Sequence, residues 1–175
     1  MHTLTLLTGG SRSGKSAYAL KLTEGYDRKT FIATAEPFDD EMRHRIEQHK
    51  KNRSGEFETV EEPIEIADAI QKAAAKTDVV LLDCLTAWIG NLRYRLSDAN
   101  LEARHMARLM ALLQPPPCDT ILVTNEVGMG IVPENGESRE FRDTAGFLNQ
   151  RIAGIADRVF FLVCGLPISI KSPYQ

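Results

Sequence analysis

Apolar runs and amphipathic stretches alternate along the chain, and this alternation predicts its secondary structure. The apolar runs are short and bounded by polar or turn-forming residues, as buried strands are. They predict strands over residues 3–8, 30–34, 79–83, 120–124 and 158–163, with shorter strands at 57–60 and, at a sheet edge, 167–171. Strands that alternate with helical stretches indicate an α/β fold with a mostly parallel central sheet flanked by helices.

The stretches between the strands carry helical patterns. They predict helices over residues 15–24, 39–51, 63–75, 101–113 and 139–156. Pro63 stands at the first turn of the third of these, where its missing N–H costs nothing. The fourth stops before the stiff run Pro115-Pro116-Pro117. We find no internal repeat and no linker, so we expect residues 1–175 to form a single domain.

Composition and charge limit the classes of protein to which the chain can belong. The 175 residues suffice to bury a core, and the formal charge of -3 argues against a nucleic-acid partner bound through bulk positive charge. No apolar run approaches the roughly 18 residues of a membrane span, and the start is too short for a signal peptide. Two of the three cysteines lie in or beside apolar runs, which predicts buried, reduced thiols and a cytoplasmic location.

The strongest motif follows the first predicted strand and opens the first predicted helix. It fits the pattern G-x-x-x-x-G-K-[ST] of a phosphate-binding loop, or P-loop, and comprises Gly9, Gly10, Ser11, Arg12, Ser13, Gly14, Lys15 and Ser16. Its glycines let backbone N–H groups point at phosphate oxygens, and the helix N-terminus adds partial positive charge. We expect Lys15 to reach the β- and γ-phosphates and Ser16 to ligate Mg²⁺. The alternative is a chance Gly/Ser turn.

Asp83 ends the buried strand predicted at residues 79–83. An acidic residue at the carboxyl end of a parallel strand can hold Mg²⁺, or the water around it, beside the P-loop serine. The motif therefore predicts a metal site formed by Ser16 and Asp83. A strand-ending aspartate that only caps the next helix is the other interpretation.

The helix predicted at 39–51 is highly charged, acidic at its start and basic at its end, as suits the helix dipole. Arg45, His49 and Arg53 are four residues apart and share one face if the helix extends that far. A neutral imidazole between two cations is a plausible nucleophile toward phosphate. Met42 and Ile46 fall on nearly the same stripe, so the spacing alone favours a partly packed His49 at the edge of the core.

Several further segments occur in a specific order. They are Phe31 to Ala35, Asp40-Glu41-Met42, Thr59 to Pro63, Leu81 to Thr86, Val123-Thr124-Asn125-Glu126-Val127-Gly128-Met129-Gly130-Ile131-Val132-Pro133, Phe141-Arg142-Asp143, Gly146 and Asn149-Gln150-Arg151. With the P-loop and His49, they resemble the bifunctional adenosylcobinamide kinase / adenosylcobinamide-phosphate guanylyltransferase family of cobalamin biosynthesis. The resemblance runs almost end to end.

The resemblance implies a role for particular residues. His49 matches the histidine that takes GMP from GTP as a covalent phosphoramidate. Nucleotide contacts are implied at the P-loop and at Ala33, Thr34, Ala35, Lys50, Lys51, Asn52, Arg53, Glu61 and Asp83. The resemblance also implies a homotrimer, with the site near a subunit boundary. The roles of Glu126, Arg142 and Asp143 stay open.

Two reactions follow from the resemblance. The first phosphorylates the aminopropanol hydroxyl of adenosylcobinamide with GTP or ATP and Mg²⁺, and the second transfers GMP from GTP to that phosphate and releases pyrophosphate. Two alternatives remain, namely a small P-loop kinase for another metabolite with a structural His49, and a non-enzymatic GTP-dependent switch. Against the switch, the sequence has no obvious N-K-x-D segment for guanine specificity.

Overall fold

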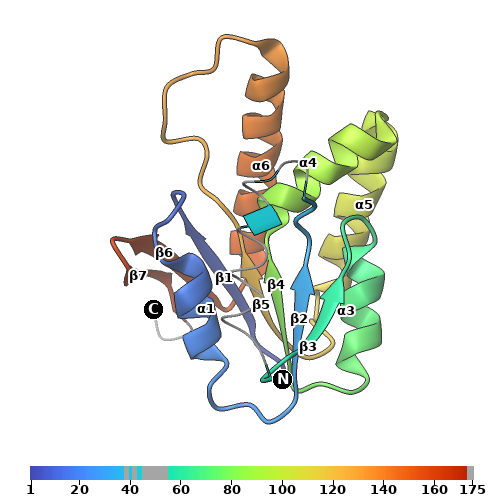
Figure 1. The fold of residues 1–175 in the computed structure, drawn as a ribbon, viewed down its shortest axis with the longest axis vertical. Helices are drawn as coiled ribbons and strands as arrows, with labels where there is room; N and C mark the ends of the chain where they lie inside the picture. The colour runs from blue at the N-terminus through green and yellow to red at the C-terminus, as the bar shows by residue number, and fades with distance from the viewer. Residues whose placement is uncertain (38–39, 41–42, 45–54, 173–175) are drawn as a thin grey trace.

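The computed structural model describes residues 1–37, 40, 43–44 and 55–172. Their centre is a seven-stranded sheet with the strand order β3-β2-β4-β5-β1-β6-β7 (Figure 1). The strands are β1 (Leu4–Gly9), β2 (Lys29–Ala33), β3 (Glu58–Glu61), β4 (Val79–Asp83), β5 (Asp119–Val123), β6 (Arg158–Val163) and β7 (Leu166–Lys171). All pair in parallel except β7, which runs antiparallel to β6 at the edge. The structure confirms the predicted α/β fold.

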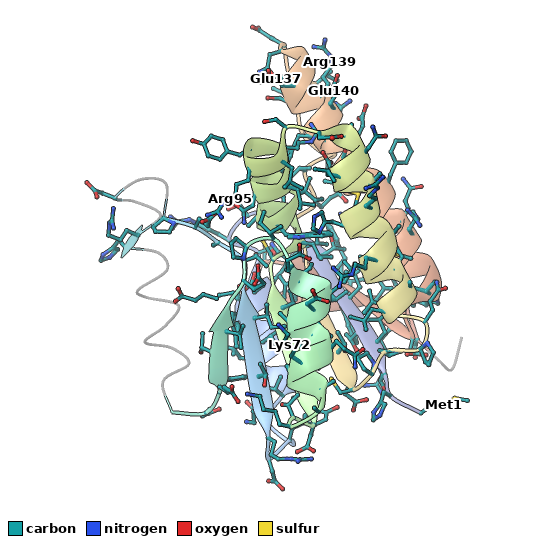
Figure 2. All side chains as sticks on the ribbon, turned by 90° about the vertical axis from the view of Figure 1, so that its right-hand side faces the viewer. Met1, Lys72, Arg95, Glu137, Arg139 and Glu140 are labelled. Carbon is teal, nitrogen blue, oxygen red and sulfur yellow. The ribbon has the colours of Figure 1, made fainter. Side chains whose placement is uncertain are left out.

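Two layers of helices cover the sheet. The described helices are α1 (Lys15–Leu22), α3 (Ile66–Ala74), α4 (Leu85–Leu96), α5 (Ala99–Leu112) and α6 (Gly136–Ile155). Helix α1 packs on one face, and α3, α4, α5 and α6 pack on the other (Figure 1). Figure 2 shows this larger helical layer, with Lys72 on its outer surface and with Glu137, Arg139 and Glu140 where α6 projects beyond the sheet.

The strands divide the core in two because successive side chains point to opposite faces of a sheet. In β4, Val80 and Leu82 join the larger cluster under α3 to α6, while Val79 and Leu81 join the smaller cluster under α1. All four are buried. Burial on both faces explains why the strand is a continuous apolar run rather than an alternating one.

The observed elements differ from the prediction in two helices. Helix α4 was not predicted at all, because it begins directly after Cys84 with no loop to separate it from β4. Its buried face includes Thr86 and Asn91, which blur the apolar period. Helix α3 begins at Ile66 rather than at residue 63, so Pro63 precedes the helix instead of forming its first turn. Of the helix predicted over 39–51, residues 40, 43 and 44 are described, and they are helical.

The three cysteines are free, as predicted, but their burial differs. Cys118 is buried, Cys84 is half-buried and Cys164 is exposed at the turn between β6 and β7. The prediction of buried thiols is therefore wrong for Cys164, which follows the apolar strand β6 in sequence but lies at its end. Among the described helices, none combines the length and apolarity needed to cross a membrane.

Candidate active site

The P-loop connects the end of β1 to the start of α1 at the carboxyl edge of the sheet. Gly14 has a φ of +96°, in the left-handed region that side chains disfavour. A Cβ on Gly14 would also lie 2.8 Å from the backbone Cα of Gly165, between β6 and β7. Gly165 N–H donates to Ser13 O at 2.9 Å. The loop is therefore shaped by its glycines and held in place by the β6–β7 turn.

Lys15 folds back over this loop. Its buried ammonium donates to Gly9 O at 2.9 Å, to Gly10 O at 2.6 Å and to Ser13 Oγ at 3.3 Å. Burial lowers the pKa of Lys15, while the nearby charge of Asp83 acts in the opposite direction. The lysine thus lies where oxygen atoms of a phosphate in the loop would compete for its three N–H donors.

Ser16 and Asp83 meet as the sequence predicted. The Ser16 hydroxyl donates to Asp83 Oδ2 at 2.7 Å across 67 residues of sequence. Both groups offer oxygen, the ligand type that Mg²⁺ prefers, and magnesium sites at triphosphates often use one or two protein ligands with phosphate and water. Within the described ranges, no cluster of three or more His, Cys, Asp or Glu residues could hold a metal. Ser16 and Asp83 are the residues that would hold a magnesium ion here.

The predicted contacts on β2, β3 and β4 lie in one row. Ala33 pairs with Asp83 on one side and with Glu61 on the other. The strand register thus brings three residues that are distant in sequence to the same edge, next to the Ser16–Asp83 pair. Parallel strands place ligand sites at this carboxyl edge.

Thr34 has a different environment from its neighbours. Its side chain is fully buried. Its hydroxyl donates to Cys84 O at 2.7 Å and accepts the Cys84 N–H at 2.9 Å. Both hydrogen-bonding functions of the hydroxyl are therefore used within the protein, where they join the ends of β2 and β4. Sequence reasoning missed this structural role.

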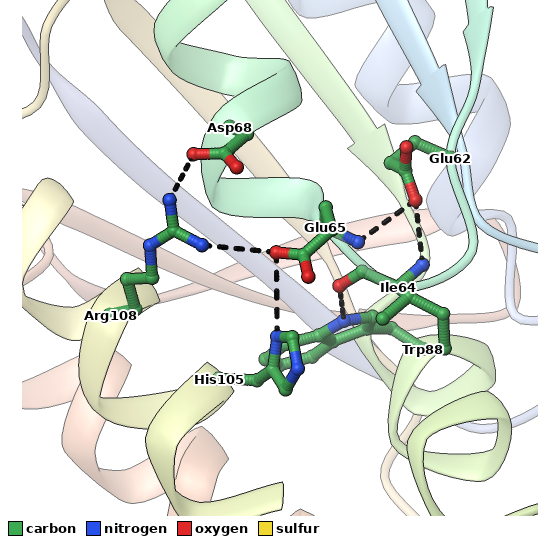
Figure 3. A network of polar contacts seen from close by, with 7 residues as sticks. All are labelled: Glu62, Ile64, Glu65, Asp68, Trp88, His105 and Arg108. Carbon is green, nitrogen blue, oxygen red and sulfur yellow. Dashed lines mark hydrogen bonds and ion pairs between the residues drawn. The ribbon is translucent and has the colours of Figure 1, made fainter. Parts of the chain in front are cut away.

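A polar network fixes the segment that follows Glu61 (Figure 3). Glu62 Oε1 accepts the N–H groups of Ile64 and Glu65 at 2.9 Å each, just before α3. The Trp88 indole donates to Ile64 O at 2.8 Å. Arg108 of α5 contacts both Glu65 and Asp68. The segment beside the candidate site is thereby attached to α4 and α5.

Asn91, buried on α4, connects the two segments that carry predicted nucleotide contacts. Its Nδ2 donates to Thr34 O at 2.7 Å and to Pro63 O at 3.2 Å. One amide thus links the chain after β2 to the chain after β3. No motif in the sequence pointed to Asn91, because its partners are brought together only by the fold.

The connection after β5 is also tightly held. Asn125 N–H donates to Thr86 Oγ1 at 2.8 Å, and Asn149 Nδ2 donates to Asn125 O at 3.3 Å. Glu126 N–H donates to Gly9 O at 3.0 Å, at the start of the P-loop. Glu126 Oε1 accepts the Gly128 N–H at 2.7 Å. The fold therefore fixes Glu126, whose role the sequence left open, beside the phosphate-binding loop.

Comparison with known proteins identifies the family. The model of "Cobinamide kinase / cobinamide phosphate guanyltransferase" matches residues 5–170. The bifunctional adenosylcobalamin biosynthesis protein CobU of Salmonella typhimurium is 41% identical, with 96% of this chain and 99% of that protein aligned. The CobP protein of Pseudomonas aeruginosa is 40% identical over 95% and 96%. The chain belongs to the cobinamide kinase / cobinamide phosphate guanyltransferase family. It is therefore an enzyme that combines a kinase with a guanylyltransferase.

Solved structures support the fold alone. A KaiC-like protein of Pyrococcus horikoshii OT3 superposes with a TM-score of 0.50 at 19% identity, covering 91% of this chain and 70% of that one. An ATPase of a bacterial type III secretion system gives a TM-score of 0.57 at 11% identity, covering 95% and 56%. The P-loop NTPase fold predicted from the sequence is confirmed.

Some predicted site residues lie outside the described residues. These are His49, Lys50, Lys51, Asn52 and Arg53. Other residues of the family pattern contact neighbouring side chains. Arg142, whose role the sequence left open, forms an ion pair with Asp143 at 3.2 Å on α6. Asn149 is buried and accepts the Thr124 hydroxyl at 2.8 Å.

Proposed function

We propose that this family member phosphorylates the aminopropanol hydroxyl of adenosylcobinamide with GTP or ATP, and then transfers GMP from GTP to the new phosphate. The observation that carries the proposal is the Lys15 and Ser16–Asp83 arrangement at the P-loop of a chain in this family. The products of the second step are adenosylcobinamide-GDP and pyrophosphate.

One triphosphate site serves both reactions in this proposal. The P-loop residues from Gly9 to Ser16 bind the phosphates. Ser16 and Asp83 would hold Mg²⁺, which would neutralise charge on the transferred group. Ala33, Ala35 and Glu61 contact the nucleotide from the neighbouring strand ends. Thr34 contributes through its position, because its hydroxyl is already bonded to Cys84. Lys50, Lys51, Asn52 and Arg53 complete the contacts.

The transferase reaction proceeds through His49. Its imidazole attacks the α-phosphate of GTP, a nitrogen–phosphorus bond forms, and pyrophosphate leaves. The phosphate of the acceptor then displaces the imidazole. Division of one displacement into two at a nucleophilic side chain is covalent catalysis, and it predicts ping-pong kinetics.

Labelled nucleotide tests this proposal. The purified protein is incubated with Mg²⁺ and GTP labelled at the α-phosphate, beside a γ-labelled sample and the variants His49→Ala and His44→Ala. We expect an α-derived protein adduct that is stable in base, labile in acid, present in the wild type and His44→Ala, and absent from His49→Ala. If GTP binds but no adduct forms, the histidine mechanism is wrong, and a simple kinase or a GTP-dependent switch takes its place.

We further propose a cytoplasmic homotrimer. Support for self-association comes from apolar side chains that are exposed in the single chain: Met129, Ile131 and Val132 after β5, and Leu166, Ile168 and Ile170 on β7. Exposed apolar patches of this kind often mark protein contacts. Light scattering coupled to size exclusion gives the mass directly, and a monomer at micromolar concentration would contradict the trimer.

A further inference from the structure

Glu126 occupies a particular place among the strands. In the order β3-β2-β4-β5-β1, strand β5 lies between the strand that ends in Asp83 and the strand that ends in the P-loop. The chain leaving β5 therefore emerges between Asp83 and the P-loop. Glu126 is the third residue after that strand, and its backbone bonds directly to Gly9 of the P-loop.

The side chain of Glu126 is half-buried, and within the described part of the chain it accepts one hydrogen bond, from the N–H of Gly128. A carboxylate can accept about four hydrogen bonds. A single N–H thus leaves acceptor positions for a further donor. The carboxylate lies close to Gly128, because a Cβ added to that glycine would be 2.9 Å from Oε1.

Other described carboxylates at this edge have different roles. Asp83 accepts the Ser16 hydroxyl and is the proposed magnesium ligand. Glu62 caps the start of α3, and Glu36 forms an ion pair with Arg95 of α4. Glu61 ends β3, which three strands separate from β1. Among the described carboxylates at this edge, Glu126 therefore combines proximity to the P-loop with free acceptor capacity.

The two reactions of the proposed function differ in what they require of the acceptor. The kinase acceptor is an alcohol, whose proton must leave as the oxygen attacks phosphorus. The transferase acceptor is a phosphate monoester, which is already ionised near neutral pH. A general base is therefore required by the first reaction and not by the second.

We propose that Glu126 is the general base of the kinase reaction. A Glu126 carboxylate oxygen accepts the proton of the acceptor hydroxyl while that oxygen forms a bond to the γ-phosphorus. The bond from the γ-phosphorus to the β-phosphate oxygen breaks, and the nucleoside diphosphate leaves with the electron pair. The proton then passes from Glu126 to water. This inference rests on the proposed function, because it requires an alcohol acceptor at the P-loop.

The experiment compares both reactions in one preparation of full-length protein. Kinase activity is measured as transfer of label from γ-labelled GTP to adenosylcobinamide. Guanylyl transfer is measured from α-labelled GTP to adenosylcobinamide phosphate supplied directly. The main variant is Glu126→Gln, which keeps the side-chain shape and an oxygen for the Gly128 N–H but cannot take a proton. Glu134→Gln, an exposed glutamate in the same connection between β5 and α6, is the matched control.

We expect Glu126→Gln to lower the kinase kcat by about 100-fold or more, the usual contribution of a general base. Guanylyl transfer should change by less than about threefold, and Glu134→Gln should leave both rates at wild-type values. Gly128→Ala provides an independent test, because it displaces the carboxylate without removing it. It should also lower the kinase rate more than the transferase rate.

Three outcomes distinguish the inference from its premise. If the wild type performs neither reaction, the proposed function is wrong. If the wild type performs both and Glu126→Gln retains kinase activity, Glu126 is not the base although the proposed function stands. If Glu126→Gln lowers both reactions equally, the residue supports the structure of the site, and the inference is again overturned.

Discussion

Two threonines at strand ends provide a test of the hydrogen bonding that holds the site. Thr34 follows β2, and its hydroxyl makes two bonds to the backbone of Cys84. Thr8 precedes the P-loop at the end of β1, and its hydroxyl is also buried. In the part of the chain that the structure describes, the Thr8 hydroxyl has no hydrogen-bond partner. Valine has nearly the same shape as threonine, so Thr34→Val and Thr8→Val remove only the polar group.

The cost of Thr34→Val follows from the bonds that remain. Cys84 O keeps the N–H of Trp88 at 3.1 Å, so this carbonyl is not left without a partner. The Cys84 N–H loses the acceptor that the Thr34 hydroxyl supplies. A buried donor without an acceptor costs about 1–3 kcal/mol, and we expect the free energy of unfolding to fall by this amount. Thr8→Val leaves no new buried group without a partner. We therefore expect the free energy of unfolding to stay the same or to rise by up to about 1 kcal/mol.

Urea denaturation measures both effects. Trp88 is the single tryptophan and is buried, so its fluorescence reports unfolding. The midpoint should fall for Thr34→Val with an unchanged slope, which indicates a change in stability alone. Two results would refute the reasoning. One is a Thr34→Val variant within about 0.5 kcal/mol of the wild type, the usual range for a substitution away from a structural feature. The other is a Thr8→Val variant that loses as much stability as Thr34→Val.

Three further predictions address charge and reactivity. Lys15→Met should lower the rates of both reactions by about 100-fold or more, because it removes the cation at the phosphates. The control Lys21→Met, at an exposed position on α1, should leave both rates at wild-type values. Cys164 is exposed, while burial raises the pKa of Cys84 to about 12. A thiol reagent at pH 8 should therefore modify one thiol quickly in the native protein and three after denaturation, and Cys164→Ser should abolish the fast phase. Burial and a hydrogen bond to a carboxylate also raise the pKa of Tyr26 to about 12. A group whose pKa is raised in the folded state contributes its full stabilisation at a pH below its pKa in the unfolded state. The free energy of unfolding should therefore decline as the pH rises from about 9 toward 12. Tyr26→Phe should make that decline shallower in urea titrations.

The parts of the site that the sequence predicts are those with a local signal or a simple topological rule. The P-loop is one continuous segment, and its glycines are needed by its own backbone, as the left-handed φ of Gly14 illustrates. The contact between Ser16 and Asp83 required only that Asp83 ends one buried parallel strand and that Ser16 ends the P-loop, which follows another. Separation along the chain does not matter for such a prediction, because the carboxyl ends of the parallel strands lie on one edge of the sheet.

The residues that the sequence did not reveal act through contacts between elements. Asn91 and Thr34 each form a hydrogen bond to a backbone atom that is more than 45 residues away along the chain. No motif in the sequence indicates these partners. Helix α4 escaped prediction for a related reason. Its buried face carries polar residues that bond to neighbouring connections, so its apolar pattern is interrupted where the helix supports the site.

The proposed chemistry divides between two connections of the sheet. His49 belongs to the connection between β2 and β3, and Glu126 belongs to the connection after β5. In the strand order, β4 with Asp83 lies between β2 and β5. The proposed nucleophile and the proposed base thus belong to connections that leave strands on either side of β4. In the proposed function both reactions use the same P-loop and the same magnesium ion, so Asp83→Asn should impair both. Substitution of His49 should impair only guanylyl transfer, and substitution of Glu126 should impair only the kinase reaction. A single triphosphate site that serves two different acceptors requires this difference between the variants.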